Sequence, residues 1–127
     1  MSVERIAWIT DPHLDFLRGQ AVRGFCHSIA DARPDAVLAG GDIGTASSLG
    51  AYLDVLEDQL ACPIYFVLGN HDFYGSSVAR ACPRAVMGVR GLASLYSQSS
   101  DRLHWLPDCG AVALTGRTGL IGHDGWA

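Results

Sequence analysis

The 127-residue sequence contains no lysine, so all nine of its fixed side-chain cations are arginines. This absence excludes a P-loop, whose phosphate-binding motif requires lysine, and it excludes catalysis through a lysine Schiff base. The apolar residues form short runs, none of which reaches the ~18 residues that a membrane-spanning helix needs. A net charge of −4 argues against a large nucleic-acid-binding surface, which needs clustered cations, but does not exclude a nucleic-acid partner. We therefore expect a soluble protein and no membrane association.

The cysteines are widely scattered along the chain. The four cysteines form no Cys-x-x-Cys pair and no dense pattern of the kind that cross-links small secreted domains: Cys26, Cys62, Cys82 and Cys109. We interpret them as reduced thiols. The N-terminal stretch MSVERIAWITD has an apolar run that is too short and too mixed for a signal peptide, and we expect a cytoplasmic location.

Three short apolar runs alternate with two segments of helical periodicity in the first 70 residues. The predicted strands are residues 5–10, 35–40 and 62–70, and the predicted helices lie within residues 16–33 and 46–61. Ser47 or Ser48 is a plausible N-cap of the second helix. Strands that alternate with helices are typical of consecutive βαβ units with a parallel sheet. The sequence therefore predicts an α/β fold, and its length fits one domain.

The pattern is looser after residue 72. Residues 76–98 predict a helix that is interrupted by Pro83, Gly88 and Gly91. Three short strands are predicted next, and the last two form a hairpin around the turn GRTG: residues 103–106, 111–115 and 119–123. We expect these strands to begin a second sheet with an uncovered apolar edge, which favours pairing with another chain.

Polar side chains follow each of the first three predicted strands: Asp11 and His13, then Asp42, then Asn70, His71 and Asp72. The carboxyl ends of parallel strands meet at one edge of the sheet, where ligands bind. Asp11 and His13 are two residues apart, a spacing that places both side chains on the same side of an extended segment. Each motif taken alone has an ordinary interpretation as a turn or helix-cap residue. Their joint placement at strand ends predicts a metal site.

In order and setting, these motifs resemble those of the calcineurin-like metallophosphoesterases, which are DxH, GD and GNH[DE]. They stand here as DPH, GGD and GNHD, and the resemblance extends over essentially the whole chain up to GHDGWA. It implies that residues 1–127 are a metallophosphoesterase domain, with the βαβαβ half of an α/β/β/α sandwich and the start of its second sheet. It also implies a metal-dependent phosphoesterase, in which a metal-bound hydroxide hydrolyses a phosphomonoester or phosphodiester substrate.

The resemblance further implies a dinuclear site for two divalent metal ions. Asp11 and His13 would hold the first ion, Asp42 would bridge both, and Asn70 would bind the second through its side-chain oxygen. Oxygen and nitrogen ligands without thiolate suit Mn, Fe or Zn in an open catalytic site. His71 would protonate the leaving oxygen or stabilise the phosphoryl charge, and Asp72 or a nearby acid would orient it.

The later ligands of the family, a histidine on a later strand and a GHxH motif, are missing from this sequence. Only Asp42 and Asn70 then remain for the second ion, so we expect that site to be incomplete. His123 is a possible substitute, whereas we interpret His27 and His104 as packing or surface residues. We expect either a domain truncated at its C-terminus or a short chain that completes its site or sheet as a homo-oligomer.

Two other functions remain open at this point. One is a catalytically inactive metal-binding or oligomerising module that keeps half of the fold. The other is a doubly wound nucleotide-binding domain, which is weakened because no glycine-rich loop follows the first predicted strand.

Overall fold

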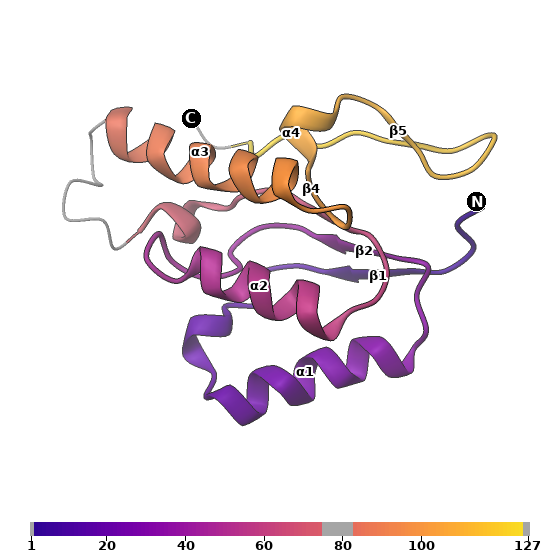
Figure 1. Cartoon of the computed structure of the whole chain (residues 1–127), viewed down its shortest axis with the longest axis horizontal. Coiled ribbons are helices and arrows are strands. Elements are labelled where there is room, and N and C mark those ends of the chain that lie inside the picture. Colours follow the sequence, from indigo (N-terminus) through magenta and orange to yellow (C-terminus); the bar gives the residue numbers. More distant parts are fainter. Residues whose placement is uncertain (1, 75–82, 126–127) are drawn as a thin grey trace.

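The computed structural model describes residues 2–74 and 83–125. It contains a four-stranded parallel sheet in the order β1-β2-β3-β4, with a separate two-stranded antiparallel sheet (Figure 1). The strands of the parallel sheet are β1 (Ile6–Ile9), β2 (Ala36–Ala39), β3 (Ile64–Phe66) and β4 (Leu103–Trp105). The long helices are α1 (Gly19–Asp31), α2 (Leu49–Gln59) and α3 (Pro83–Ser99). The short elements are the 3₁₀ helices η1 (Leu14–Phe16) and η2 (Asn70–Phe73), the helix α4 (Leu106–Cys109), and the strands β5 (Val112–Ala113) and β6 (Gly119–Leu120).

The first part of the chain forms the predicted βαβαβ arrangement, and the α/β fold class is confirmed. β1 pairs in parallel with β2, and β2 pairs in parallel with β3. The prediction that residues 103–106 begin a second sheet is wrong. β4 instead pairs in parallel with β3, because α3 acts as one more crossover helix and returns the chain to the edge of the same sheet.

The later elements differ from the sequence expectations in one further respect. β5 and β6 pair antiparallel, as the predicted hairpin requires. α3, however, runs without a break through Gly88 and Gly91, while residues 75–82 before it lie outside the described part. Burial of Val89 and Ala93 against the core outweighs the ~1 kcal/mol that each glycine costs in a helix. None of the helices among the described residues has the length and apolar character needed to traverse a bilayer.

Ser48 is the N-cap residue of α2, in agreement with one of the two predicted caps. Its hydroxyl, however, accepts a hydrogen bond from the backbone N–H of Thr45 at 2.9 Å and makes no capping bond to the helix. The side chain therefore stabilises the turn that precedes α2.

Three of the four cysteines lie in the described part of the chain, and each is a free thiol: Cys26, Cys62 and Cys109. Burial raises the pKa of each of these thiols, which keeps them protonated at neutral pH. This agrees with the interpretation of reduced thiols, and Cys82 lies outside the described residues.

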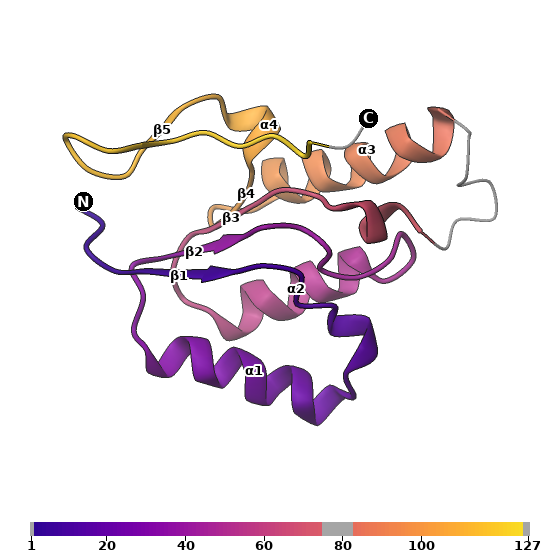
Figure 2. The ribbon, with the colours of Figure 1, turned by 180° about the vertical axis from the view of Figure 1, so that it is seen from behind.

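The two faces of the parallel sheet differ. Val37 and Phe66 are buried on the face that packs against the helices. On the other face, the strand register aligns one side chain from each strand in a row: Trp8, Leu38, Tyr65 and His104. Figure 2 looks onto the sheet from the side opposite α2. We call these four residues the open-face row; Trp8 is 74% exposed, and the rings of Tyr65 and His104 stack at 5.0 Å, which makes His104 a packing residue as predicted.

Candidate metal centre

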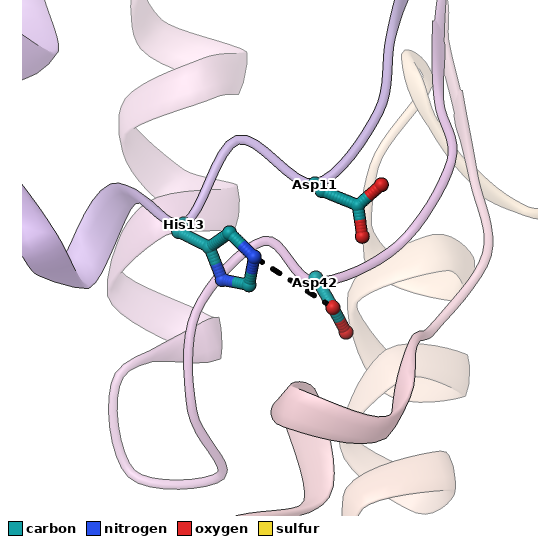
Figure 3. A group of neighbouring side chains, drawn as sticks. All are labelled: Asp11, His13 and Asp42. Carbon is teal, nitrogen blue, oxygen red and sulfur yellow. Dashed lines mark ion pairs between the residues drawn. The ribbon is translucent and has the colours of Figure 1, made fainter.

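The loops that follow β1 and β2 are joined by backbone hydrogen bonds. The N–H of Asp11 donates to the carbonyl of Gly41 at 3.2 Å, and the N–H of His13 donates to the carbonyl of Asp42 at 2.9 Å. The side chains of Asp11, His13 and Asp42 converge in the space between these loops (Figure 3). Two motifs that are about 30 residues apart therefore meet at the carboxyl edge of the sheet, as parallel pairing of β1 and β2 requires.

The backbone at these three residues is in an unfavourable conformation. Asp11, His13 and Asp42 have φ values of 48°, 43° and 52°, and among the described non-glycine residues only Arg33 shares a positive φ. Left-handed backbone at a non-glycine residue is uncommon, and it persists only where the surrounding structure enforces it. Its concentration at the predicted ligands indicates that the two loops are shaped to direct these side chains.

The three side chains offer ligand atoms that lie within 4.8 Å of one another. Nε2 of His13 lies 3.8 Å from Oδ2 of Asp42. Two ligands of one zinc-sized ion, each at ~2.1 Å, lie at most ~4.2 Å apart. The His13–Asp42 distance already meets that limit, and small side-chain rotations would bring the whole group within it.

The environment of Asp42 also fits a cation. Its side chain is 10% exposed, and His13 is the ion-pair partner recorded for it in the described part of the chain. Nδ1 of His13 is buried and has no hydrogen-bond partner among the described residues. Because a buried carboxylate is costly without a cation, a bound metal ion would stabilise this arrangement.

The GNHD motif approaches Asp42 from β3. The backbone N–H of His71 donates to Oδ1 of Asp42 at 3.0 Å. A Cβ atom at Gly69 would lie 2.1 Å from that same oxygen, and one at Gly41 would lie 2.7 Å from the nitrogen of Gly69. Gly41 also has a φ of 97°. The glycines of GGD and GNHD are thus required because the two loops touch backbone to backbone.

Asn70 lies at the start of η2, immediately after this contact. Its Nδ2 atom donates to the hydroxyl of Tyr74 at 3.1 Å, which fixes the amide and leaves Oδ1 as the available ligand atom. Its role as a metal ligand stays a prediction.

The imidazole of His71 lies beside the Asp11–His13–Asp42 group. Its ring centroid is 4.7 Å from that of His13 and 4.7 Å from that of Tyr74. Phe16 stacks on the ring of His13, with the two centroids 5.2 Å apart. Phe16 and Tyr74 are 72% and 48% exposed, so the two imidazoles are flanked by accessible aromatic rings that the motifs did not single out.

The side chain of Asp72 is fully buried and bonds to the main chain. Oδ1 accepts the N–H of Gly44 and Oδ2 accepts the N–H of Gly69, both at 2.9 Å. Burial raises the pKa of Asp72 to about 6; these two N–H donors oppose the rise, and the nearby Asp42 adds to it. Asp72 therefore ties the loop after β2 to the loop after β3. This structural role was not foreseen, while orientation of His71 by Asp72 stays a prediction.

Two other histidines lie apart from the group that could hold a metal. His123 is exposed, and its Nδ1 accepts the N–H of Gly125 at 2.9 Å. His27 is exposed on α1, as expected for a surface residue. The neighbour of His123, Asp124, is buried instead and accepts the N–H of Leu68 at 2.8 Å, a contact that no sequence pattern signals.

Residues 4–126 match the family model described as calcineurin-like phosphoesterase. The chain belongs to this family. A probable cyclic nucleotide phosphodiesterase of Pseudoalteromonas sp. (strain SM9913) is 35% identical over 81 residues, which cover 54% of this chain and 31% of that protein. The chain thus spans about a third of the length of this curated relative. No solved structure matches the calcineurin-like phosphoesterase chain significantly.

Proposed function

We propose that this calcineurin-like phosphoesterase chain supplies the first metal site and the proton-transfer histidine of an enzyme that hydrolyses phosphodiesters. The observation that carries the proposal is the convergence of Asp11, His13 and Asp42, whose ligand atoms lie within 4.8 Å of one another at the carboxyl edge of the sheet. Family membership supports a phosphoester substrate in general. The compartment in which the protein acts stays a prediction.

In this proposal, Asp11, His13 and Asp42 would hold one divalent cation, and Asp42 together with Asn70 would hold a second. Support for the shared role comes from the two oxygens of Asp42, because Oδ2 lies toward His13 and Oδ1 lies toward the GNHD loop. When bound, divalent cations lower the pKa of the attacking water and neutralise charge on the phosphoryl oxygens.

His71 is proposed to donate a proton to the leaving oxygen. Its ring lies next to that of His13, and its backbone is fixed by the hydrogen bond to Asp42. A side chain that is held beside the metal ligands without being one of them is suited to proton transfer, since its position does not depend on the metal.

A diester with an aromatic substituent is the proposed substrate class. The relative from Pseudoalteromonas is named as a probable cyclic nucleotide phosphodiesterase. Phe16 lies against the ring of His13 and Tyr74 lies against that of His71, both are exposed, and such rings stack favourably on the flat face of a nucleobase.

The proposal is tested with bis(p-nitrophenyl) phosphate and p-nitrophenyl phosphate in the presence of Mn²⁺. We expect the diester to be hydrolysed faster, and Asp42→Asn to reduce the rate at least ~100-fold, because the loss of a metal ligand removes several kcal/mol of transition-state stabilisation. Asp31→Asn removes an exposed carboxylate from α1 and serves as the matched control. A folded chain that binds no Mn²⁺ would refute the proposal.

The alternative function is a metal-binding module without catalytic activity, and the small number of predicted ligands for the second ion favours it. It predicts that the folded chain binds Mn²⁺ through Asp42 and hydrolyses neither ester. Binding without turnover therefore separates this alternative from the proposed phosphodiesterase.

A further inference from the structure

The end of β3 carries a backbone donor that the parallel sheet does not satisfy. Along β3 the N–H groups alternate in direction: Ile64 donates to Arg102 on the β4 side, at 2.7 Å, and Val67 donates to Ala39 on the β2 side, at 3.1 Å. This alternation directs the N–H of Leu68 toward the β4 side. β4 ends at Trp105, and the chain turns into α4 at the next residue, so β4 offers no carbonyl at that level.

Asp124 replaces the missing carbonyl. Its Oδ1 accepts the N–H of Leu68 at 2.8 Å and the indole Nε1–H of Trp105 at 3.1 Å. Its Oδ2 lies 3.5 Å from Nε of Arg90 on α3, and the carboxylate side chain is 1% exposed. One buried side chain thus joins the end of β3, β4 and α3.

The backbone around Asp124 is held tightly in place. A Cβ atom at Gly122 would lie 2.8 Å from Cβ of Leu106 and 3.0 Å from Cγ1 of Val67. Only glycine allows the chain to pass this close to the end of β3. The position of Asp124 is therefore set by packing as well as by its hydrogen bonds.

Leu68 is directly connected to the metal centre. It precedes Gly69, which touches Oδ1 of Asp42 so closely that no side chain fits between them. Two residues further on, the N–H of His71 donates to the same oxygen at 3.0 Å. A shift of Leu68 would therefore move the GNHD loop relative to Asp42.

We propose that Asp124 is a positioning residue of the metal centre, which fixes the GNHD loop against Asp42 by accepting the N–H of Leu68. Its relevance to catalysis rests on the proposed function, but the positioning itself concerns the metal-free chain. The carboxylate of Asp124 takes the place of the carbonyl that β4 does not provide beyond Trp105. It thereby keeps the GNHD loop at a fixed distance from Asp42.

The first test measures hydrogen exchange of the Leu68 and His71 amides in the metal-free 127-residue chain. We expect Asp124→Ala to retain its far-UV circular dichroism spectrum while both amides exchange at least ~10-fold faster. The Leu68 amide loses its acceptor directly, and the His71 amide lies on the loop that this hydrogen bond holds against Asp42. Asp124→Asn keeps Oδ1 as an acceptor and is expected to restore the protection of both amides. Asp101→Ala removes an exposed carboxylate from the turn before β4 and is the matched control.

The second measurement is the Mn²⁺ affinity of the same variants, for which we expect Asp124→Ala to bind ~10-fold more weakly and Asp124→Asn to bind nearly as well as the parent. Unchanged protection of His71 in Asp124→Ala would overturn the proposal, and so would an Asn variant as impaired as the Ala variant. If the Ala variant does not fold, Asp124→Ser gives the same comparison. A parent chain that binds no Mn²⁺ refutes the proposed function, while the exchange of His71 still decides the positioning role.

Discussion

At the level of single residues, the carboxylate of Asp42 is held from three directions. Its φ of 52° directs the side chain between the two loops, the N–H of His71 binds one oxygen, and His13 faces the other. Gly69 adds a steric limit, because it leaves no space for a side chain against Oδ1. The carboxylate therefore has little freedom to move before a metal ion binds, which reduces the ordering cost of binding.

Gly69→Ala tests this steric limit. The new Cβ would lie 2.1 Å from Oδ1 of Asp42, so the loops must separate, and we expect a loss of ~2 kcal/mol or more in the free energy of unfolding together with weaker Mn²⁺ binding. Urea denaturation and metal titration provide the measurements. Gly24→Ala is the control, since nothing lies within 4 Å of its Cβ position on α1, and it should stabilise the chain by ~0.5 to 1 kcal/mol. Equal effects of the two substitutions would contradict the argument.

His71→Ala separates proton transfer from metal binding. We expect turnover of the diester to fall by ~10²- to 10⁴-fold, the usual contribution of a general acid, with the metal content unchanged. Steady-state kinetics and metal analysis of the purified variant give the two quantities. His27→Ala on the exposed side of α1 should alter neither. Loss of metal from the His71 variant would identify His71 as a ligand and contradict its assigned role.

At the scale of the elements, the sequence predicts the strands and helices that depend on a local apolar pattern. The first three strands and two helices follow from apolar periodicity, and the polar residues at the strand ends follow from the parallel order of these strands. β4 could not be assigned to its sheet, because a three-residue run carries no information about its partner. The same limit applies to Asp124, whose contacts join residues that are 19 and 56 positions apart.

The junction of β1 and β2 gives a prediction about pH. Oδ2 of Asp35, just before β2, accepts the N–H groups of Glu4 and Arg5 at 2.9 and 2.8 Å. These two hydrogen bonds lower the pKa of Asp35 from its ordinary value of 3.8. Because the folded pKa is the lower one, the stabilisation is complete above the ordinary value and is lost as the pH falls through the folded pKa.

We therefore expect the free energy of unfolding to decrease less steeply below pH 4 in Asp35→Asn than in the parent, since the amide does not titrate. Urea denaturation between ~pH 2 and ~pH 7 measures the slope. Asp35→Ala removes the acceptor altogether and should lower stability at neutral pH as well. A parent and an Asn variant with identical slopes would show that Asp35 does not contribute to acid unfolding.

At the scale of the whole molecule, the long helices of the described part cover one face of the parallel sheet and leave the open-face row on the other. The open-face row runs across all four strands, and Ile6 on the same face of β1 is 40% exposed beside Trp8. β1 is also an edge strand, with its outer backbone groups unpaired within the described sheet. An exposed apolar surface next to a free edge favours association with a second surface of the same kind.

We expect the 127-residue chain to self-associate through this face in a concentration-dependent manner, which corresponds to one of the two alternatives that the sequence left open, the homo-oligomer. Trp8→Ser should weaken the association at least ~10-fold, because truncation of a tryptophan at the centre of an interface typically costs ~2 kcal/mol or more. Phe16→Ser removes a similarly exposed ring from η1, the 3₁₀ helix after β1, and should leave the association unchanged. Sedimentation velocity over a range of concentrations distinguishes the two variants. A parent that stays monomeric throughout, or two variants with equal effects, would show that the open-face row is not the contact surface.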